Sequence, residues 1–200
     1  MELEQAVRER RAVKHYDADY EIPEEEVKQL LELAILSPTS FNVQNWRPVL
    51  VKDKELRAKI REAAWDQAQV TDASLLFVMC ADLKSYAKDP VRYWANAPKE
   101  AQDMLVPMIV PFYEGKPELE RDEAMRSVGI ISQTIMLTAK AMGYDSCPMI
   151  GFDPEKVAEL IKLPEDHVVG MLLVVGKATK PAWPKPGQLP LEDIVVNDTF

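Results

Sequence analysis

A loop rich in hydroxyl and amide side chains is the most distinctive chemical feature of this sequence. The segment from Ser37 to Pro48 gathers three hydroxyls, three amides and one arginine around Pro38. Serine, proline and asparagine also dominate ordinary turns, so a plain helix-ending turn is the alternative. Gln44, Trp46 and Arg47 extend the pattern beyond what a turn needs. We therefore expect this loop to hydrogen-bond a flat, polar ligand.

A run of cations precedes the loop. Arg10, Arg11 and Lys14 lie within five residues, after a short amphipathic helix expected around Leu3 and Val7. Guanidinium groups can grip a phosphate in a forked geometry, although a solvated basic helix end is the simpler alternative. The seven glycines form no Gly-x-Gly-x-x-Gly and no P-loop, so side chains would have to hold any phosphate. Together the two segments suggest a mononucleotide ligand.

These segments resemble the FMN-dependent nitroreductases. That family carries an Arg-Arg/His-Ser-x-Lys/Arg run followed by a Ser-Pro-Ser/Thr-x-x-Asn-x-Gln-x-Trp loop, and both match here, with Ala12 where the family usually has serine. The segment from Gly143 to Phe152 resembles the family's Gly-x-Asp/Glu-x-x-Pro-x-x-Gly-Phe turn, and Leu189-Pro190-Leu191 resembles its tail. The resemblance therefore spans nearly the whole chain.

The resemblance implies a role for each matched position. Arg10 and Arg11 correspond to the residues that touch the FMN phosphate and ribityl chain. Lys14 corresponds to the residue at the N1/O2 side of the isoalloxazine, where a cation stabilises the negative charge that develops on reduction. The turn from Pro148 to Gly151 would present backbone N–H groups to flavin O4 and N5, with Gly151 allowing close approach.

Two further segments carry residues that are expected to bind the cofactor, and both segments depart from the family pattern. Gln67 and Gln69 match an Asn-Gln-x-x-Val segment at the pyrimidine edge, but Asp66 stands where asparagine is frequent, and a solvated helix end is the alternative. In the tail, Lys185 would supply a charge and Gln188 a hydrogen bond where relatives carry arginine. The expected cofactor-binding set is Arg10, Arg11, Ala12, Lys14, Pro38, Thr39, Ser40, Asn42, Gln67, Gln69, Pro148, Met149, Ile150, Gly151, Lys185 and Gln188.

Hydrophobic periodicity predicts alternating helices and strands. Helices are expected at 24–36, 54–67 and 119–142, strands at 49–51, 74–80, 145–150 and 168–175, and a helix start at Asp153-Pro154. Prolines between Tyr86 and Pro117 predict short or kinked helices there, and a lid whose aromatic side chains either contact substrate or belong to the core. The resulting expectation is a single α+β domain, residues 1–200, nitroreductase-like, with a central mixed sheet flanked by helices.

The tail after Lys180 is too apolar to be solvated and, with four prolines, too proline-rich for a helix. It is expected to pack along a partner. In the family that partner is the other subunit, so the resemblance implies a homodimer with an exchanged tail and FMN at the subunit interface.

Composition excludes several classes of function. The formal charge is −9, with 33 acidic against 24 basic residues among 200, which argues against nucleic-acid binding. Cys80 and Cys147 lack metal-ligand spacing, and neither His15 nor His167 sits in a ligand-spaced cluster, so no metal is expected. No apolar stretch indicates a signal peptide or a membrane span, which favours a cytoplasmic protein.

The resemblance implies an FMN-dependent NAD(P)H oxidoreductase. Hydride would pass from NADH or NADPH through flavin N5 to a nitroaromatic, quinone or similar acceptor by a ping-pong mechanism. The cofactor would carry the chemistry, so no catalytic side chain is assigned. Two alternatives stay open: an FMN-binding sensor or interaction protein with residual reductase activity, and a flavin-free dimer that binds another phosphate-bearing ligand.

Overall fold

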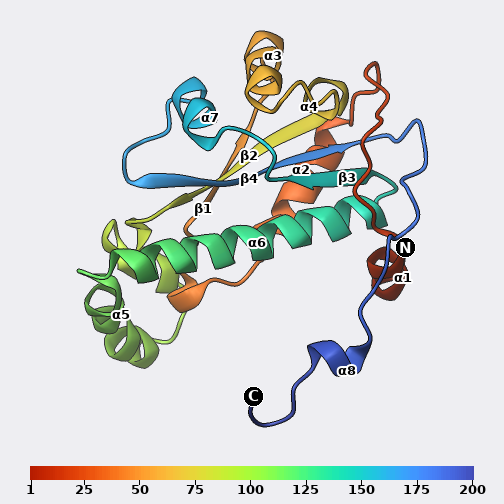
Figure 1. Cartoon of the computed structure of the whole chain (residues 1–200). Helices are drawn as coiled ribbons and strands as arrows, with labels where there is room; N and C mark the ends of the chain where they lie inside the picture. The colour runs from red at the N-terminus through yellow and green to blue at the C-terminus, as the bar shows by residue number, and fades with distance from the viewer.

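A four-stranded sheet forms the centre of the computed structural model, which describes all residues from 1 to 200 (Figure 1). The strands are β1 (Trp46–Leu50), β2 (Leu75–Asp82), β3 (Asp145–Met149) and β4 (His167–Gly176), arranged in the order β1-β2-β4-β3. The strands β2 and β4 are therefore central, while β1 and β3 are the edges. The four strands appear within a few residues of where the hydrophobic runs predicted them.

The α+β class is confirmed, but all three strand pairs are antiparallel and the sheet is not mixed. The one parallel contact is an isolated bridge between Ala12 and Ser146. A hydrophobic run locates a strand without giving its direction, which depends on the end of the sheet to which each connection returns the chain. The continuous burial of β2 suggested cover on both faces, and antiparallel strands with two helical layers provide it equally well.

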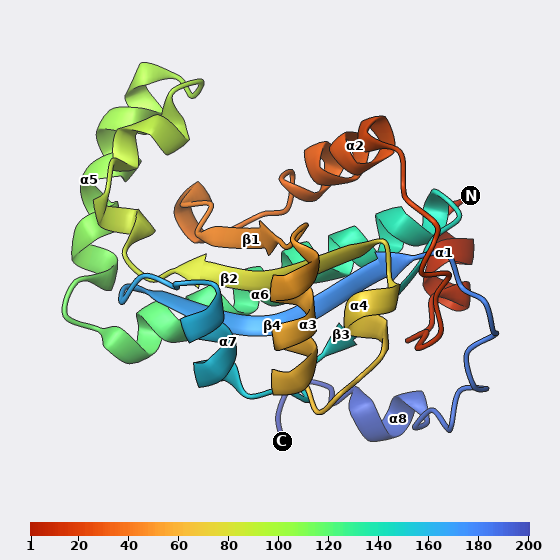
Figure 2. The ribbon, with the colours of Figure 1, turned by 90° about the horizontal axis from the view of Figure 1, so that it is seen from above.

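Two helical layers enclose the sheet (Figures 1 and 2). The helices are α1 (Leu3–Glu9), α2 (Glu24–Ala34), α3 (Lys54–Ala63), α4 (Gln69–Asp72), α5 (Lys99–Tyr113), α6 (Pro117–Ala141), α7 (Pro154–Leu160) and α8 (Leu191–Ile194), with 3-10 turns at Ser40–Asn42, Ser85–Ala87 and Pro90–Trp94. Along β2, Phe77 and Met79 face the core formed with α2 and α6. Leu76 and Val78 face the opposite core, formed with α3, α4 and α7.

The helix α6 is the longest element and was predicted from its three- and four-residue spacing. It crosses the sheet closely at Gly170 of β4, where a Cβ atom would lie only 2.6 Å from Cγ1 of Val128. Ile131 and Ile135 on the same helix are fully buried against the sheet. Their burial removes apolar surface from water and is a main source of stability for this layer.

The helix α3 ends at Ala63, four residues earlier than predicted. Trp65 and Asp66 both adopt left-handed backbone conformations, with φ of 55° and 56°. Neither residue can continue a right-handed helix in this conformation. The short helix α4 then begins at Gln69, so the segment between the two helices is a tight connection that hydrophobic periodicity could not reveal.

The region of prolines contains two short 3-10 turns, Ser85–Ala87 and Pro90–Trp94, and the helix α5. The sequence predicted short or kinked helices here, and α5 is not short, because it runs for 15 residues through Pro107 and Pro111. Both prolines lie on the exposed side of the helix, so water can bond the carbonyls that they leave unpaired. The opposite side buries Ile109 and Tyr113 in an aromatic cluster, which holds the helix together.

The tail leaves the body of the molecule beyond β4 (Figure 1). Trp183, Leu189 and Leu191 are largely exposed, and Phe200 is fully so. The expectation that the tail forms no helix is wrong for α8, one turn that begins directly after Pro190. Proline is well tolerated at the start of a helix, because the first N–H groups of a helix have no partner within it in any case. None of the helices combines the length and apolar character that crossing a bilayer requires.

Candidate functional site

The basic run lies along the outer edge of β3. The N–H of Val13 donates to the carbonyl of Ser146 at 3.1 Å, which fixes the backbone between Arg10 and Lys14 beside this strand. Burial raises the pKa of the Cys147 thiol, and the nearby charges of Lys14 and Arg10 partly oppose this rise. The two cations are therefore close to β3.

The three cations of this run are free of partners within the chain. Arg10, Arg11 and Lys14 take part in no ion pair and no side-chain hydrogen bond. A surface cation with no internal partner keeps its full hydrogen-bonding capacity for a ligand. The basic run can therefore bind an anionic group without first breaking a contact of its own.

The turn after β3 offers two backbone donors. The N–H groups of Ile150 and Gly151 make no hydrogen bond within the chain, because the ladder with β4 ends at Met149. The side chain of Ile150 is 82% exposed. Trp65, which is 72% exposed, lies so close that a Cβ on Gly151 would approach its ring to 2.9 Å. Free donors beside exposed apolar surface suit the edge of a flat, partly apolar ring.

The two predicted glutamines reach this turn but bond to the protein itself. Gln67 Nε2 donates to the carbonyl of Gly151 at 2.7 Å and to that of Ala64 at 3.0 Å. Gln69, which is buried, donates from its Nε2 to Gln67 Oε1 at 3.0 Å. Both donors of Gln67 are thus occupied, and direct contact of either glutamine with a ligand stays a prediction.

Asp66 is also occupied. Its Oδ1 accepts a hydrogen bond from Nε of Arg61 at 2.7 Å, across the turn that ends α3. A carboxylate forms an ion pair with this guanidinium, whereas the asparagine that is frequent in the family could accept the hydrogen bond but would add no charge of its own. The departure at this position therefore has a local structural role.

The hydroxyl- and amide-rich loop has an unusual backbone. Phe41, Asn42 and Gln44 all have positive φ, between 43° and 55°. Asn42 Nδ2 donates to the carbonyl of Tyr93 at 2.7 Å, and Trp94 Nε1 donates to the carbonyl of Phe41 at 3.0 Å. Non-glycine residues in this region cost about 1–3 kcal/mol each and cluster at functional sites. The loop is therefore held in a strained form by its contacts with the turn Pro90–Trp94.

The residues that were expected to bind the cofactor fall into two groups, which lie far apart within one chain. Both views show the loop from Pro38 to Asn42 at the α5 end of the molecule and the basic run near α1 at the other end (Figures 1 and 2). Lys185 borders a hollow beside α1, and neither Lys185 nor Gln188 makes a side-chain hydrogen bond. The structure thus brings Arg10, Arg11, Ala12 and Lys14 near the turn Pro148–Gly151, but not near the loop.

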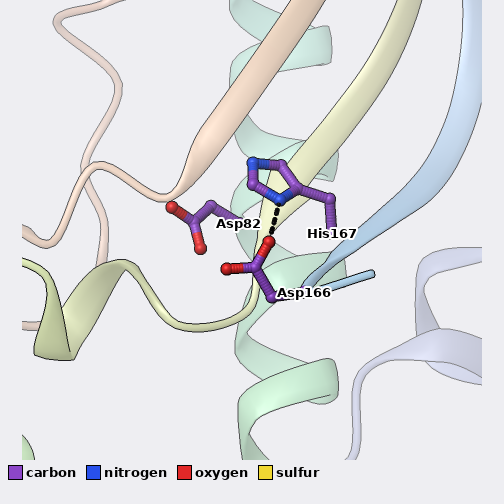
Figure 3. A group of neighbouring side chains, drawn as sticks. All are labelled: Asp82, Asp166 and His167. Carbon is purple, nitrogen blue, oxygen red and sulfur yellow. Dashed lines mark hydrogen bonds and ion pairs between the residues drawn. The ribbon is translucent and has the colours of Figure 1, made fainter. Parts of the chain in front are cut away.

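A cluster of titratable groups that sequence spacing did not reveal lies where β2 ends and β4 begins (Figure 3). His167 Nδ1 and Asp166 Oδ1 are 2.6 Å apart, and both face Asp82. Lys88 Nζ bridges the two carboxylates at 2.8 Å from Asp82 and 2.7 Å from Asp166, and Arg47 lies 3.8 Å from Asp82. These cations already neutralise the carboxylates that a metal would need, so we interpret the cluster as an ion-pair network.

Unpaired backbone donors, exposed apolar side chains and unpaired cations thus lie beside the edge strand of an antiparallel sheet between two helical layers. The sequence model described as "Nitroreductase family" matches residues 7–177, and the chain belongs to this family.

Relatives match over nearly their whole length. Protein DrgA of Synechocystis is 53% identical over 96% of this chain and 93% of its own length. A protein of Thermus thermophilus named NADH dehydrogenase is 30% identical over 98% of this chain and 96% of its own length. A structure from Exiguobacterium sibiricum, solved in complex with FMN, has a TM-score of 0.91 at 31% identity, covering 98% of this chain and 97% of that one. The nitroreductase-like fold is thus confirmed.

The ion-pair network generates a prediction about stability. Replacing Lys88 with methionine leaves the buried Asp82 short of its closest cation, and we expect the free energy of unfolding to fall by about 1–3 kcal/mol at neutral pH. The hydrogen bond from Lys88, followed by that from His167, lowers the pKa of Asp166 from its ordinary 3.8. A lowered carboxylate pKa adds stability above the ordinary value and loses it as the pH falls. The deficit of Lys88→Met should therefore shrink below about pH 4.

Urea unfolding at pH 7 and pH 3.5 measures both effects. Lys59→Met is the matched control, because Lys59 is exposed on α3 and has no ion pair. An equal deficit at the two pH values, or no deficit at pH 7, would contradict the prediction.

Proposed function

We propose that the protein is an FMN-dependent NAD(P)H oxidoreductase that reduces a nitroaromatic, quinone or similar acceptor. When bound, FMN supplies the redox chemistry, a ping-pong transfer of hydride from NAD(P)H through flavin N5 to the acceptor. The observation that carries the proposal is the end of β3, where two unpaired backbone donors lie beside exposed apolar side chains and near unpaired cations.

The residues present fit this cofactor. The N–H groups of Ile150 and Gly151 would donate to the O4 and N5 side of the ring, while Pro148 and Met149 complete the turn. Isoalloxazine is flat and partly apolar, which suits the exposed surfaces of Ile150 and Trp65. Hydride transfer depends on placement and on a tuned ring, so the absence of an acid–base pair among these residues is compatible with the reaction.

The basic run would bind the other parts of FMN. Arg10 and Arg11 would hold the phosphate and ribityl chain, with Ala12 contributing backbone contacts. Lys14 would lie at the pyrimidine edge. Because none of the three cations has a partner within the chain, their charge is available to the phosphate and to the reduced ring.

We further propose that two copies of the chain build the complete site. Within one chain the loop that carries Pro38, Thr39, Ser40 and Asn42 lies at the other end of the molecule from the basic run (Figure 2). A second copy could place its loop against this basic run. The exposed apolar tail supports this arrangement, because a solvated tail would not need so many large apolar side chains. Lys185 and Gln188 would then join the site from the tail.

We also propose a cytoplasmic location. Cys80 and Cys147 are both buried and form no disulfide. Unbridged cysteines suit a reducing compartment.

The visible absorption spectrum of the purified protein tests the cofactor and the electron donor together. We expect flavin bands, present on purification or after adding FMN and removing the excess. Anaerobic NADH or NADPH should bleach them, and a quinone should restore them. Bands that persist with both donors would support an FMN sensor. Protein that retains no flavin would overturn the cofactor assignment and favour another phosphate-bearing ligand.

The cation at position 14 should tune the bound flavin. Lys14→Ala removes a positive charge from the edge where negative charge develops, and we expect the reduction potential to fall by about 20–60 mV, from a charge interaction of about 1–3 kcal/mol. A redox titration with excess FMN measures this shift. Lys59→Ala, at an exposed lysine on α3, is the control. An unchanged potential in Lys14→Ala would exclude this role.

The tail should stabilise the dimer. Removing residues 181–200 deletes Lys185, Gln188 and the exposed apolar side chains, so we expect a shift from dimer to monomer and FMN binding weakened about tenfold or more. Light scattering and flavin fluorescence measure the two effects, and a chain lacking only Thr199 and Phe200 is the control. A truncated chain that stays dimeric and binds FMN normally would refute the proposed role.

A further inference from the structure

The turn Pro148–Gly151, which offers the two free N–H groups, is called the donor turn below. The side chain of Gln67 links it to the segment after α3. Beyond Met149 the turn has no ladder bonds, and Phe152 bonds only locally, to the carbonyl of Ile150. Two contacts anchor it to the end of α3: Gln67 Nε2 to the Gly151 carbonyl at 2.7 Å, and the Asp153 N–H to the Ala63 carbonyl at 2.9 Å. Only the first of these acts on a peptide of the donor turn itself.

The orientation of the Gln67 amide follows from its neighbours. The carbonyls of Ala64 and Gly151 can only accept, so the NH₂ group of Gln67 must face them. Its oxygen then faces Gln69, whose Nε2 donates to it at 3.0 Å. Gln69 is 4% exposed, and breaking this bond would leave polar groups unpaired away from water. The amide of Gln69 therefore fixes the orientation of the Gln67 amide, which donates to the Gly151 carbonyl.

Packing restricts Gly151 from the same side. A Cβ atom there would lie 2.9 Å from the Trp65 ring and 3.4 Å from Gln67 Nε2. The left-handed backbone at Trp65 and Asp66, together with the bond from Arg61 to Asp66, places both groups against the turn. The Gly151 carbonyl, in the peptide that links Gly151 to Phe152, is held by Gln67. The N–H of the same peptide, on Phe152, donates at 3.1 Å to the Ile150 carbonyl, which shares its peptide with the Gly151 N–H. The Gly151 N–H itself has no partner within the chain.

We propose that Gln67, oriented by Gln69, is a positioning residue. It holds the peptide between Gly151 and Phe152, whose N–H donates to the Ile150 carbonyl, and so fixes the neighbouring peptide, whose Gly151 N–H is aimed at N5 of the bound cofactor. Gln67 itself does not contact the cofactor. The inference rests on the proposed binding of FMN and assigns a different role to a residue that the sequence suggested as a direct ligand at the pyrimidine edge.

Comparing two flavins separates these roles. The analogue 5-deaza-FMN has a C–H group in place of N5, so it cannot accept a hydrogen bond there, but its pyrimidine ring is unchanged. Gln67→Met keeps the length of the side chain while removing both donors. We expect it to weaken FMN binding by about three- to tenfold, the effect of one misplaced hydrogen bond, and to change 5-deaza-FMN binding by less than about twofold.

Dissociation constants come from flavin fluorescence titrations of the flavin-free protein, with thermal melting to show that each variant is folded. Gln69→Leu, which leaves Gln67 in place but frees its orientation, should show a smaller selective loss of FMN. Gln29→Met, at an exposed glutamine on α2 that makes no side-chain hydrogen bond, is the matched control. If Gln67→Met does not fold, Gln67→Ala is measured in its place.

An equal loss for the two flavins in a folded variant would show that Gln67 acts on a part common to both, and would overturn the inference while leaving the proposed function intact. Unchanged binding of both flavins would overturn it as well. If the unaltered protein binds no FMN, the proposed function fails, and the inference fails with it.

Discussion

The burial of β2 on both faces is the constraint on which the rest of the structure depends. All eight of its residues are buried, and alternate side chains enter two separate cores. Each core needs its own helical cover, α2 and α6 on one side and α3, α4 and α7 on the other. Because side chains in a strand alternate between faces, a shift of one residue in the register would exchange the two cores. The positions of these five helices follow from this arrangement.

The donor turn lies where the pairing of β3 with β4 ends. The last residue of β3, Met149, pairs with Leu172, while β4 extends past this point back to its start at His167. Ile150 and Gly151 therefore have free N–H groups and lie outside the ladder. The end of α3 is packed against the same turn and holds it through Gln67. A left-handed pair at Trp65 and Asp66 makes this possible, because it turns the chain sharply back toward β3. The strained backbone after α3 is thus coupled, through Gln67, to the position of the N–H donors after β3.

Charge is distributed differently at the two ends of the sheet. Near the start of β4, Lys88 and Arg47 are bonded to Asp82 and its neighbours, so these charges stabilise the protein. Beside β3, Arg10 and Lys14 have no such partners, although the chain as a whole is strongly acidic. Cations without internal partners can attract an anionic ligand.

The sequence by itself determined the helices and strands with strong periodicity, such as α6 and β2, and the cap at Asp153, which is local in origin. It also indicated which segments could bind a phosphate and a flat ring, because those residue types appear close together along the chain. Strand direction, the early end of α3, the continuity of α5 through two prolines and the network around Lys88 were decided by the tertiary structure. These depend on contacts between residues distant in the chain, and such contacts outweigh local preference. The role of Gln67 belongs to the same class, since its partner Gly151 lies 84 residues away.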